Sequence, residues 1–278
     1  NIKGICSRRG SSNSHASILA SALGIPAVIL FGIPKDKDAH ASSCLTDNSV
    51  IANAIASIKE HAPEMLIIAD VRFCEYTSHG HCGVLDENQC LDENATLHAL
   101  NEQSLALARA GADWLAPSGM TDGMVGSMRD ALDGHGFTDV AILSYSIKYH
   151  SSMYGPFRDA AGGAPQFGDR RAYQMDYTRD AEWELEAILD TNEGADMLMV
   201  KPAQTYLDII CRLRQRIPYL PLCAYQVSGE YSLIMHGATQ GIVNEYQAMH
   251  EALTAIKRAG ADCIISYYAK AFAKQYRD

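Results

Sequence analysis

Short apolar runs alternate along this chain with longer stretches in which apolar and polar residues follow a helical period. The apolar runs have the length of buried strands. We expect eight such strands, at residues 2–6, 27–32, 65–71, 114–117, 140–146, 197–200, 222–227 and 263–268. Helical patterns lie between them, for example at 12–23, 51–61, 97–110, 181–192, 205–216 and 245–258. This alternation predicts a parallel sheet with helices outside it.

A Gly-Ala-Asp sequence recurs at 111–113, 194–196 and 260–262. In each copy the glycine can end a helix in the left-handed conformation, and an apolar strand follows at once. Recurrence of this junction indicates a repeated strand–helix unit. Eight units close into a TIM-type (β/α)8 barrel, an α/β fold whose active site lies at the carboxyl ends of the strands. We predict a single-domain barrel over residues 1–278, with an open doubly wound sheet as the alternative.

Composition and charge exclude several classes of protein. With 47% hydrophobic and 20% charged residues, the chain resembles an ordinary soluble globular protein. A formal net charge of −10 argues against a nucleic-acid partner or an anionic membrane surface. No apolar run approaches the roughly 20 residues of a membrane span. Eight cysteines in 278 residues do not suggest a disulfide scaffold, so we expect a reducing compartment, either the cytoplasm, which is our prediction, or an organelle stroma.

Two lysines at the ends of predicted strands are the first candidates for chemistry. Lys148 follows the strand at 140–146, and Lys201 follows the strand at 197–200. Burial disfavours the charged form of a lysine and lowers its pKa. A neutral amine is what a Schiff-base nucleophile needs. Either lysine alone could be a structural ion-pair partner, but two in matching positions favour a site that handles two carbonyl groups.

Longer motifs follow the same strand ends. They are Cys-Glu-Tyr-Thr-Ser-His-Gly-His-Cys-Gly at 74–83, Tyr-Gly-Pro-Phe-Arg-Asp-Ala-Ala at 154–161, Gly-Asp-Arg-Arg at 168–171, Met-Val-Lys-Pro-Ala at 199–203 and Val-Ser-Gly-Glu-Tyr at 227–231. Together they resemble the porphobilinogen synthase (δ-aminolevulinic acid dehydratase) family, from about residue 27 to the C-terminus. The resemblance implies a lyase of tetrapyrrole and heme biosynthesis, which condenses two molecules of 5-aminolevulinate into porphobilinogen and releases two waters.

The resemblance also assigns roles to individual residues. It implies that Lys201 and Lys148 form the Schiff bases. It implies that three polar residues hold the substrate amine or move protons, namely Asp70, Ser118 and Asp122. Helix capping is the alternative for these three, because Asp and Ser favour caps at strand–helix junctions.

The two substrate carboxylates need anchors, which the resemblance also supplies. Arg158, Arg170 and Gln174 are similar to the family's clamp for one carboxylate, and a guanidinium binds a carboxylate through two parallel hydrogen bonds. Ser228 and Tyr267 are similar to the hydroxyl contacts of the other. The residues expected to wall the pocket are Tyr154, Phe157 and Tyr225. The alternative for the arginine-bearing segment is a solvated loop, and a mobile lid satisfies both interpretations.

The metal site departs from the family pattern. The zinc-dependent branch carries three cysteines, of which Cys74 and Cys82 are present, but Arg72 occupies the first position. A catalytic zinc takes three protein ligands and keeps one open position. Two thiolates, helped by water, His79 or His81, could bind zinc; alternatively Arg72 supplies a fixed positive charge and the cysteines are spectators. Glu230 resembles a magnesium-site residue of part of the family, with a surface carboxylate as the alternative.

Residues 1–27 form an atypical first strand–helix unit. They resemble the phosphohistidine segment of phosphoenolpyruvate-utilising enzymes, in which a His near a helix N-terminus carries a phosphoryl group, so His15 is a candidate carrier. We interpret the segment as a sign of a chimera. The alternatives to an active synthase are an inactive recombined barrel, a one-lysine aldolase and a phosphohistidine carrier. The resemblance implies homo-oligomers, and we expect a smaller assembly here because the usual N-terminal arm is absent from the sequence.

Overall fold

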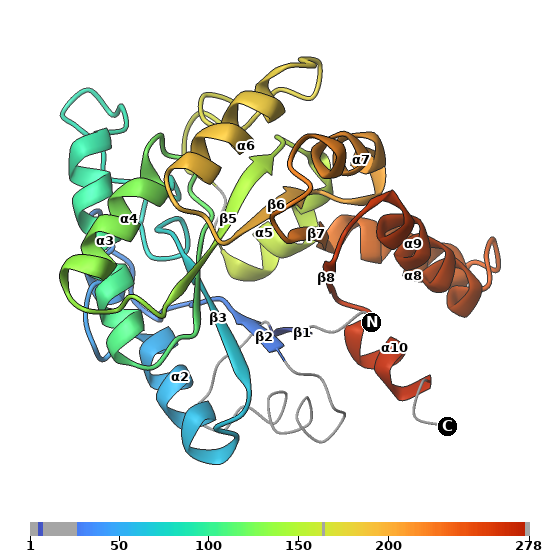
Figure 1. Ribbon diagram of the computed structural model, residues 1–278, viewed down its shortest axis with the longest axis horizontal. Coiled ribbons are helices and arrows are strands. Elements are labelled where there is room, and N and C mark those ends of the chain that lie inside the picture. The colour runs from blue at the N-terminus through green and yellow to red at the C-terminus, as the bar shows by residue number, and fades with distance from the viewer. Residues whose placement is uncertain (1–4, 8–26, 163–164, 276–278) are drawn as a thin grey trace.

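The computed structural model describes residues 5–7, 27–162 and 165–275. Their strands form one sheet in which each neighbouring pair is parallel and the order follows the sequence. The strands are β1 (Ile5–Ser7), β2 (Ala27–Leu30), β3 (Leu66–Val71), β4 (Trp114–Pro117), β5 (Ala141–Lys148), β6 (Met197–Lys201), β7 (Leu222–Gln226) and β8 (Cys263–Ser266). Because β1 and β8 also lie in contact, the sheet curls on itself, which confirms the predicted TIM-type α/β barrel (Figure 1).

Helices flank the strands on the outside of the sheet (Figure 1). They are α2 (Val50–His61), α3 (Glu93–Arg109), α4 (Met124–Gly134), α5 (Gly155–Ala161), α6 (Glu182–Asn192), α7 (Leu207–Arg216), α8 (Ser228–Thr239), α9 (Glu245–Ala259) and α10 (Ala269–Gln275), with short 3-10 turns η1 (Ser42–Cys44), η2 (Ser152–Tyr154) and η3 (Gln204–Tyr206). The helices predicted from residue 51 onward are confirmed within a few residues, and the helix predicted at 12–23 lies outside the described residues. None of the described helices is long and apolar enough to cross a membrane.

Strand alternation divides the apolar residues into two clusters. Successive side chains of a strand point to opposite faces of the sheet. On β2, Val28 and Leu30 join the large cluster between sheet and helices. Ile29 joins the cluster inside the barrel, where it lies with Ile68, Leu143, Met199 and other inward residues. The barrel interior is therefore packed with apolar side chains, and polar chemistry is confined to the strand ends.

The Gly-Ala-Asp junctions have the predicted backbone geometry and a further structural role. Gly111 and Gly194 have φ of 99°, and Gly260 has φ of 129°. The aspartate of each junction accepts a hydrogen bond from a backbone N–H of the preceding strand. These bonds join Asp113 to Ile67 at 2.7 Å, Asp196 to Ile142 at 2.8 Å and Asp262 to Leu222 at 2.9 Å. Each junction thus ties two neighbouring strands at their amino ends.

These bonds predict a stability loss when one aspartate is removed. In D196A the buried N–H of Ile142 loses its carboxylate acceptor, so we expect the free energy of unfolding to fall by roughly 1–2 kcal/mol. Urea denaturation followed by circular dichroism measures this change. D196N keeps an acceptor oxygen and is expected to retain most of the stability. Equal losses in the two variants would contradict the role of this bond.

Candidate active site

A pocket opens at the carboxyl ends of the strands, where the barrel fold predicts an active site. It encloses about 410 Å³, part of it open to solvent. Both predicted lysines and all eight predicted substrate-binding residues line it: Lys148, Lys201, Tyr154, Phe157, Arg158, Arg170, Gln174, Tyr225, Ser228 and Tyr267. Arg72, Phe31 and Val227 complete the lining. Phe31 and Tyr267, which are 236 residues apart in the sequence, therefore share one cavity.

The two lysines are neighbours across adjacent strands. Lys148 ends β5 and Lys201 ends β6, and the two are paired in the strand register. Their side chains are only 2% and 7% exposed. The Lys201 amine lies 4.4 Å from the ring centre of Tyr225, and both amines face the ring of Tyr145, at 4.9 Å for Lys201 and 5.8 Å for Lys148. Two amines thus lie side by side on an aromatic surface.

A β-bulge in β5 turns Lys148 toward the pocket. Leu143 and Tyr145 point into the barrel, so regular alternation would send residue 147 inward and residue 148 outward. The register of β5 against β6 shifts between Ser144 and Ile147. As a result Ile147 packs in the outer cluster, and Lys148 lines the pocket. A bulge inserts one extra residue into a strand and re-aims the side chains that follow it.

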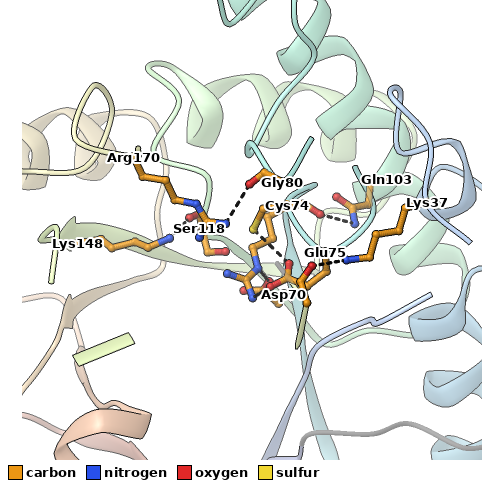
Figure 2. A network of polar contacts seen from close by, with 11 residues as sticks. Lys37, Asp70, Cys74, Glu75, Gly80, Gln103, Ser118, Lys148 and Arg170 are labelled. Atoms are coloured by element: carbon orange, nitrogen blue, oxygen red, sulfur yellow. Dashed lines mark hydrogen bonds and ion pairs between the residues drawn. The ribbon is translucent and has the colours of Figure 1, made fainter. Parts of the chain in front are cut away.

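Burial sets the ionisation of the Lys148 amine. Burial lowers its pKa to about 8, and the positive charge of Arg72 acts in the same direction, while the two nearby cysteines oppose the shift. The amine donates a hydrogen bond to the carbonyl oxygen of Ser118 (Figure 2). This bond orients the amine without requiring that it be charged. At neutral pH a far larger fraction of Lys148 is therefore uncharged than of an unburied lysine, although the charged form still predominates. The uncharged form is the one that acts as a nucleophile.

A second group of pocket residues provides donors for an anion. Arg170 donates to the Gly80 carbonyl at 3.0 Å, which fixes its side chain (Figure 2). The Arg158 guanidinium lies 5.4 Å from the ring centre of Tyr154. Gln174 is 4% exposed, and within the described residues neither its amide oxygen nor its amide nitrogen has a hydrogen-bond partner. A buried amide without partners is costly, so this group is suited to a polar ligand.

The opposite wall of the pocket is held by the start of α8. The Ser228 hydroxyl accepts a hydrogen bond from the Phe157 N–H at 3.1 Å. At Gly229, an added Cβ would lie 2.5 Å from the carbonyl oxygen of Met153, a distance that side chains do not tolerate. The missing side chain therefore lets α8 approach η2 closely. Tyr267, just beyond β8, lines the same pocket and lies 5.5 Å from the ring of Tyr231.

Three residues predicted to handle protons or the substrate amine lie outside the pocket lining. Asp70 is buried, and its Oδ2 lies 2.7 Å from Arg72 Nε in an ion pair. Ser118 is buried beside the pocket and contributes its carbonyl oxygen to Lys148. Asp122 is exposed and, with Glu186, lines a second, open groove that shares Gln174 with the pocket. The sequence predicted that all three residues lie at the carboxyl ends of the strands, but it did not show which of them face the lysines.

The Glu230 carboxylate is held by backbone N–H groups. Its carboxylate accepts hydrogen bonds from the N–H groups of Gln204 at 2.6 Å, Val227 at 2.7 Å and Ala203 at 3.4 Å. It is 3% exposed, and burial raises its pKa. Glu230 therefore connects the start of α8 to the segment that follows Lys201, and its part in a magnesium site stays a prediction. The alternative of a surface carboxylate is wrong, because the side chain is buried.

The cysteines predicted as zinc ligands, Cys74 and Cys82, lie together as a buried pair. The two thiols hydrogen-bond to each other. This bond, helped by the charges of Arg170, Lys148 and Arg72, lowers the pKa of Cys82, while the pKa of Cys74 is raised. The described residues contain no group of three His, Cys, Asp or Glu side chains that could hold a metal ion. His79 and His81 instead donate ring N–H hydrogen bonds to the carbonyl oxygens of Ala39 and Phe167.

Sequence reasoning missed several pocket residues. Phe31 and Val227 line the cavity, and Tyr145 lies beneath both amines. Strand alternation is a signal that could have found Phe31, because it stands two residues after the inward Ile29. The same count from Tyr225 gives Val227.

The fold and the site define a class of protein: a parallel α/β barrel enzyme with a pair of buried amines on its carboxyl rim. The family model described as delta-aminolevulinic acid dehydratase matches residues 7–275. The enzyme of Synechococcus elongatus with this name is 50% identical over 255 residues, covering 91% of this chain and 78% of its own. That of Escherichia coli is 49% identical over 252 residues, covering 91% and 77%. The chain belongs to the delta-aminolevulinic acid dehydratase family.

Solved structures support the same assignment. The crystal structure of delta-aminolevulinic acid dehydratase (porphobilinogen synthase) from Toxoplasma gondii, in complex with the reaction product porphobilinogen, is 39% identical. Its TM-score is 0.91, with 99% of this chain and 84% of that chain covered. An aldolase, QR15, is 11% identical with a TM-score of 0.55, covering 100% and 94%, which shows a shared fold alone.

These comparisons confirm the predicted family, the lyase class and the dehydratase function. They do not support a chimera, because the family model begins at residue 7, inside the segment that resembles a phosphohistidine unit. His15, proposed as a phosphoryl carrier, falls within the family match and lies outside the described residues. The lesson is that a short resemblance of about 27 residues carried less information than the match of the whole chain.

The depressed pKa of Lys148 leads to a direct prediction. With lysine labelled at 13Cε, the NMR signal of Lys148 is expected to titrate with a midpoint at about 8, against about 10.4 for an unburied lysine. The amine is charged below that midpoint and neutral above it. Loss of the signal in K148M identifies it. A midpoint near that of the surface lysines would contradict the stated effect of burial.

Proposed function

We propose that this chain condenses two molecules of 5-aminolevulinate into porphobilinogen, with Lys148 and Lys201 as the two nucleophiles. The observation that carries the proposal is the pairing of these lysines in the register of β5 and β6. Neighbouring strands are about 4.8 Å apart, so two ketones bound to these amines are held side by side. Holding two reactants together in this way converts a bimolecular condensation into an effectively unimolecular step.

The chemistry follows from what each amine does to a ketone. The neutral amine adds to the carbonyl carbon, and the resulting carbinolamine loses its oxygen as water to leave an imine. The imine makes the adjacent C–H acidic, so loss of that proton gives an enamine.

The enamine carbon attacks the imine carbon of the other substrate, which forms the C–C bond and leaves the second lysine attached as an amine. The amino group of that second substrate then displaces the first lysine, which forms the C–N bond. Loss of a proton from the adjacent ring carbon expels the second lysine, and transfer of a last C–H proton to the ring nitrogen gives the aromatic pyrrole. The two ketone oxygens leave as the two waters.

The other pocket residues are suited to orient the substrates. Arg158, Arg170 and Gln174 offer charged and neutral donors for one carboxylate, and Arg–carboxylate pairs fix orientation as well as charge. Ser228 and Tyr267 offer hydroxyls for the other. Tyr154, Phe157 and Tyr225 wall the cavity and keep bulk water from the amines. Asp70 and Ser118 support this arrangement through Arg72 and Lys148, and the exposed Asp122 is the least supported of the predicted catalytic residues.

Trapping and product formation test the nucleophiles. With 5-aminolevulinate and borohydride, we expect mass spectrometry to find a reduced adduct on Lys201 or Lys148. K201M is expected to lower the rate of pyrrole formation at least roughly 10³-fold, because it removes the nucleophile itself. Lys270, a lysine of α10 outside the pocket, supplies the control K270M, which should keep full activity. Product without any lysine adduct would argue against the Schiff-base mechanism, and no product at all would favour the inactive scaffold.

A separate test addresses the carboxylate anchor. R158K keeps the charge but loses the two-pronged geometry, so we expect KM for 5-aminolevulinate to rise roughly 10-fold or more. R171K is the matched control, because Arg171 is an exposed arginine of the same polar region. Steady-state kinetics measure both. An equal response of the two variants would contradict a specific role for Arg158.

The cytoplasmic location and the oligomeric state stay predictions. The family name and the site support a small-molecule substrate.

A further inference from the structure

Arg72 is a buried cation in the position where the zinc-dependent pattern has a cysteine. It stands at the carboxyl end of β3, is 4% exposed, and lines the pocket with both lysines. Ile68 points into the barrel, and two-residue alternation carries that direction to Asp70 and then to Arg72. The alternation along the strand therefore points the Arg72 guanidinium into the pocket rather than into solvent.

The guanidinium is held from several sides. Its Nε lies 2.7 Å from Asp70 Oδ2, and its Nη2 forms an ion pair with Glu75 Oε1. Its carbon lies 5.5 Å and 5.2 Å from the ring centres of Phe31 and Phe157, both of which line the pocket. A planar group fixed by two carboxylates and two rings has one orientation. Such rigidity is what electrostatic stabilisation in an active site requires.

The described residues around the thiol pair do not form a zinc site. Glu75 Oε2 lies 3.3 Å from the Cys74 thiol (Figure 2), but the Glu75 carboxylate is already paired with Arg72. Among the described residues, no third His, Cys, Asp or Glu side chain joins Cys74 and Cys82 in a group that could hold a metal ion. A divalent ion there would have two sulfur ligands and would sit beside the fixed charge of Arg72. Zinc in a catalytic site takes three protein ligands, so this donor set does not fit.

We propose that Arg72 is the resident cation of this site, and that condensation by this chain requires no metal at Cys74 and Cys82. The proposal rests on the proposed function. The guanidinium N–H groups hydrogen-bond to the carbinolamine oxygen as the C–O bond breaks and its electron pair moves to that oxygen. The departing hydroxide takes up the proton that the protonated imine nitrogen releases, and leaves as water. Asp70 and Glu75 are positioning residues that hold the guanidinium. In this proposal the positive charge of Arg72 takes the place of a zinc ion, and a chelator cannot remove it.

Metal content and chelator sensitivity test the proposal together. The purified protein is expected to contain far less than one zinc per chain by plasma mass spectrometry and to keep its activity after treatment with 1,10-phenanthroline. R72C restores the third thiol, so it is expected to bind about one zinc per chain and to lose that zinc on chelation. R109C, which adds a cysteine at an exposed arginine of α3, is the matched control and should gain none.

Two further variants separate charge from folding. R72M is expected to lower kcat roughly 100-fold, while borohydride still traps the substrate on a lysine and added zinc does not restore the rate. Because R72M and R72C leave Glu75 buried without its cation, the double variants R72M/E75Q and R72C/E75Q carry the test if circular dichroism shows that the single variants do not fold.

Each outcome bears on a distinct claim. One zinc per chain in the unaltered protein, with activity lost on chelation, would overturn the proposal. Failure of folded R72C to bind zinc would also overturn it, because Arg72 would then not occupy a metal-ligand position. If the unaltered protein forms no pyrrole under any metal condition, the proposed function fails, while the zinc content of the unaltered protein and of R72C still decides whether Arg72 has replaced the metal.

Discussion

A packed barrel interior leaves room for charged side chains only in the last inward layer of each strand, and the active site depends on that constraint. Below this layer the inward residues are apolar, among them Ile29, Ile68 and Met199. Above it the next inward positions carry Arg72, Lys148 and Lys201. Burial against the apolar layer limits hydration of the amines, which is why the pKa of Lys148 falls. The core that stabilises the barrel therefore also favours the neutral form of Lys148, the proposed nucleophile.

Charge balance explains how so many cations share one cavity. Two lysines and three arginines line the pocket, whereas the carboxylates of Asp70 and Glu75 pair with Arg72. Among the described residues that line the pocket with the other cations, there is no Asp or Glu. A buried charge without compensation is strongly destabilising. The pocket thus carries a local excess of positive charge within a chain whose formal net charge is −10, which suits the carboxylates of the proposed substrate.

Much of this arrangement could be predicted from the sequence, for identifiable reasons. Apolar runs and junction glycines indicated the strands from residue 27 onward, because the local geometry of a strand or of a helix end decides which residues occur there. The resemblance indicated Arg158, Gln174 and the other pocket residues. The β5 bulge could not be predicted, since Ser146 and Ile147 both suit a regular strand. The partners of Glu230 could not be predicted either, because its bonds join segments that are distant in sequence.

The aspartates at the Gly-Ala-Asp junctions stabilise the end of the barrel that lies opposite the pocket. Their bonds tie β3 to β4, β5 to β6 and β7 to β8 at the amino ends of these strands. The lysines and arginines lie at the opposite ends. In each tied pair, the aspartate bond lies at the amino ends of the strands, and the residues that line the pocket lie at the carboxyl ends. Residues at the carboxyl ends can therefore change without loss of the bonds that hold neighbouring strands together.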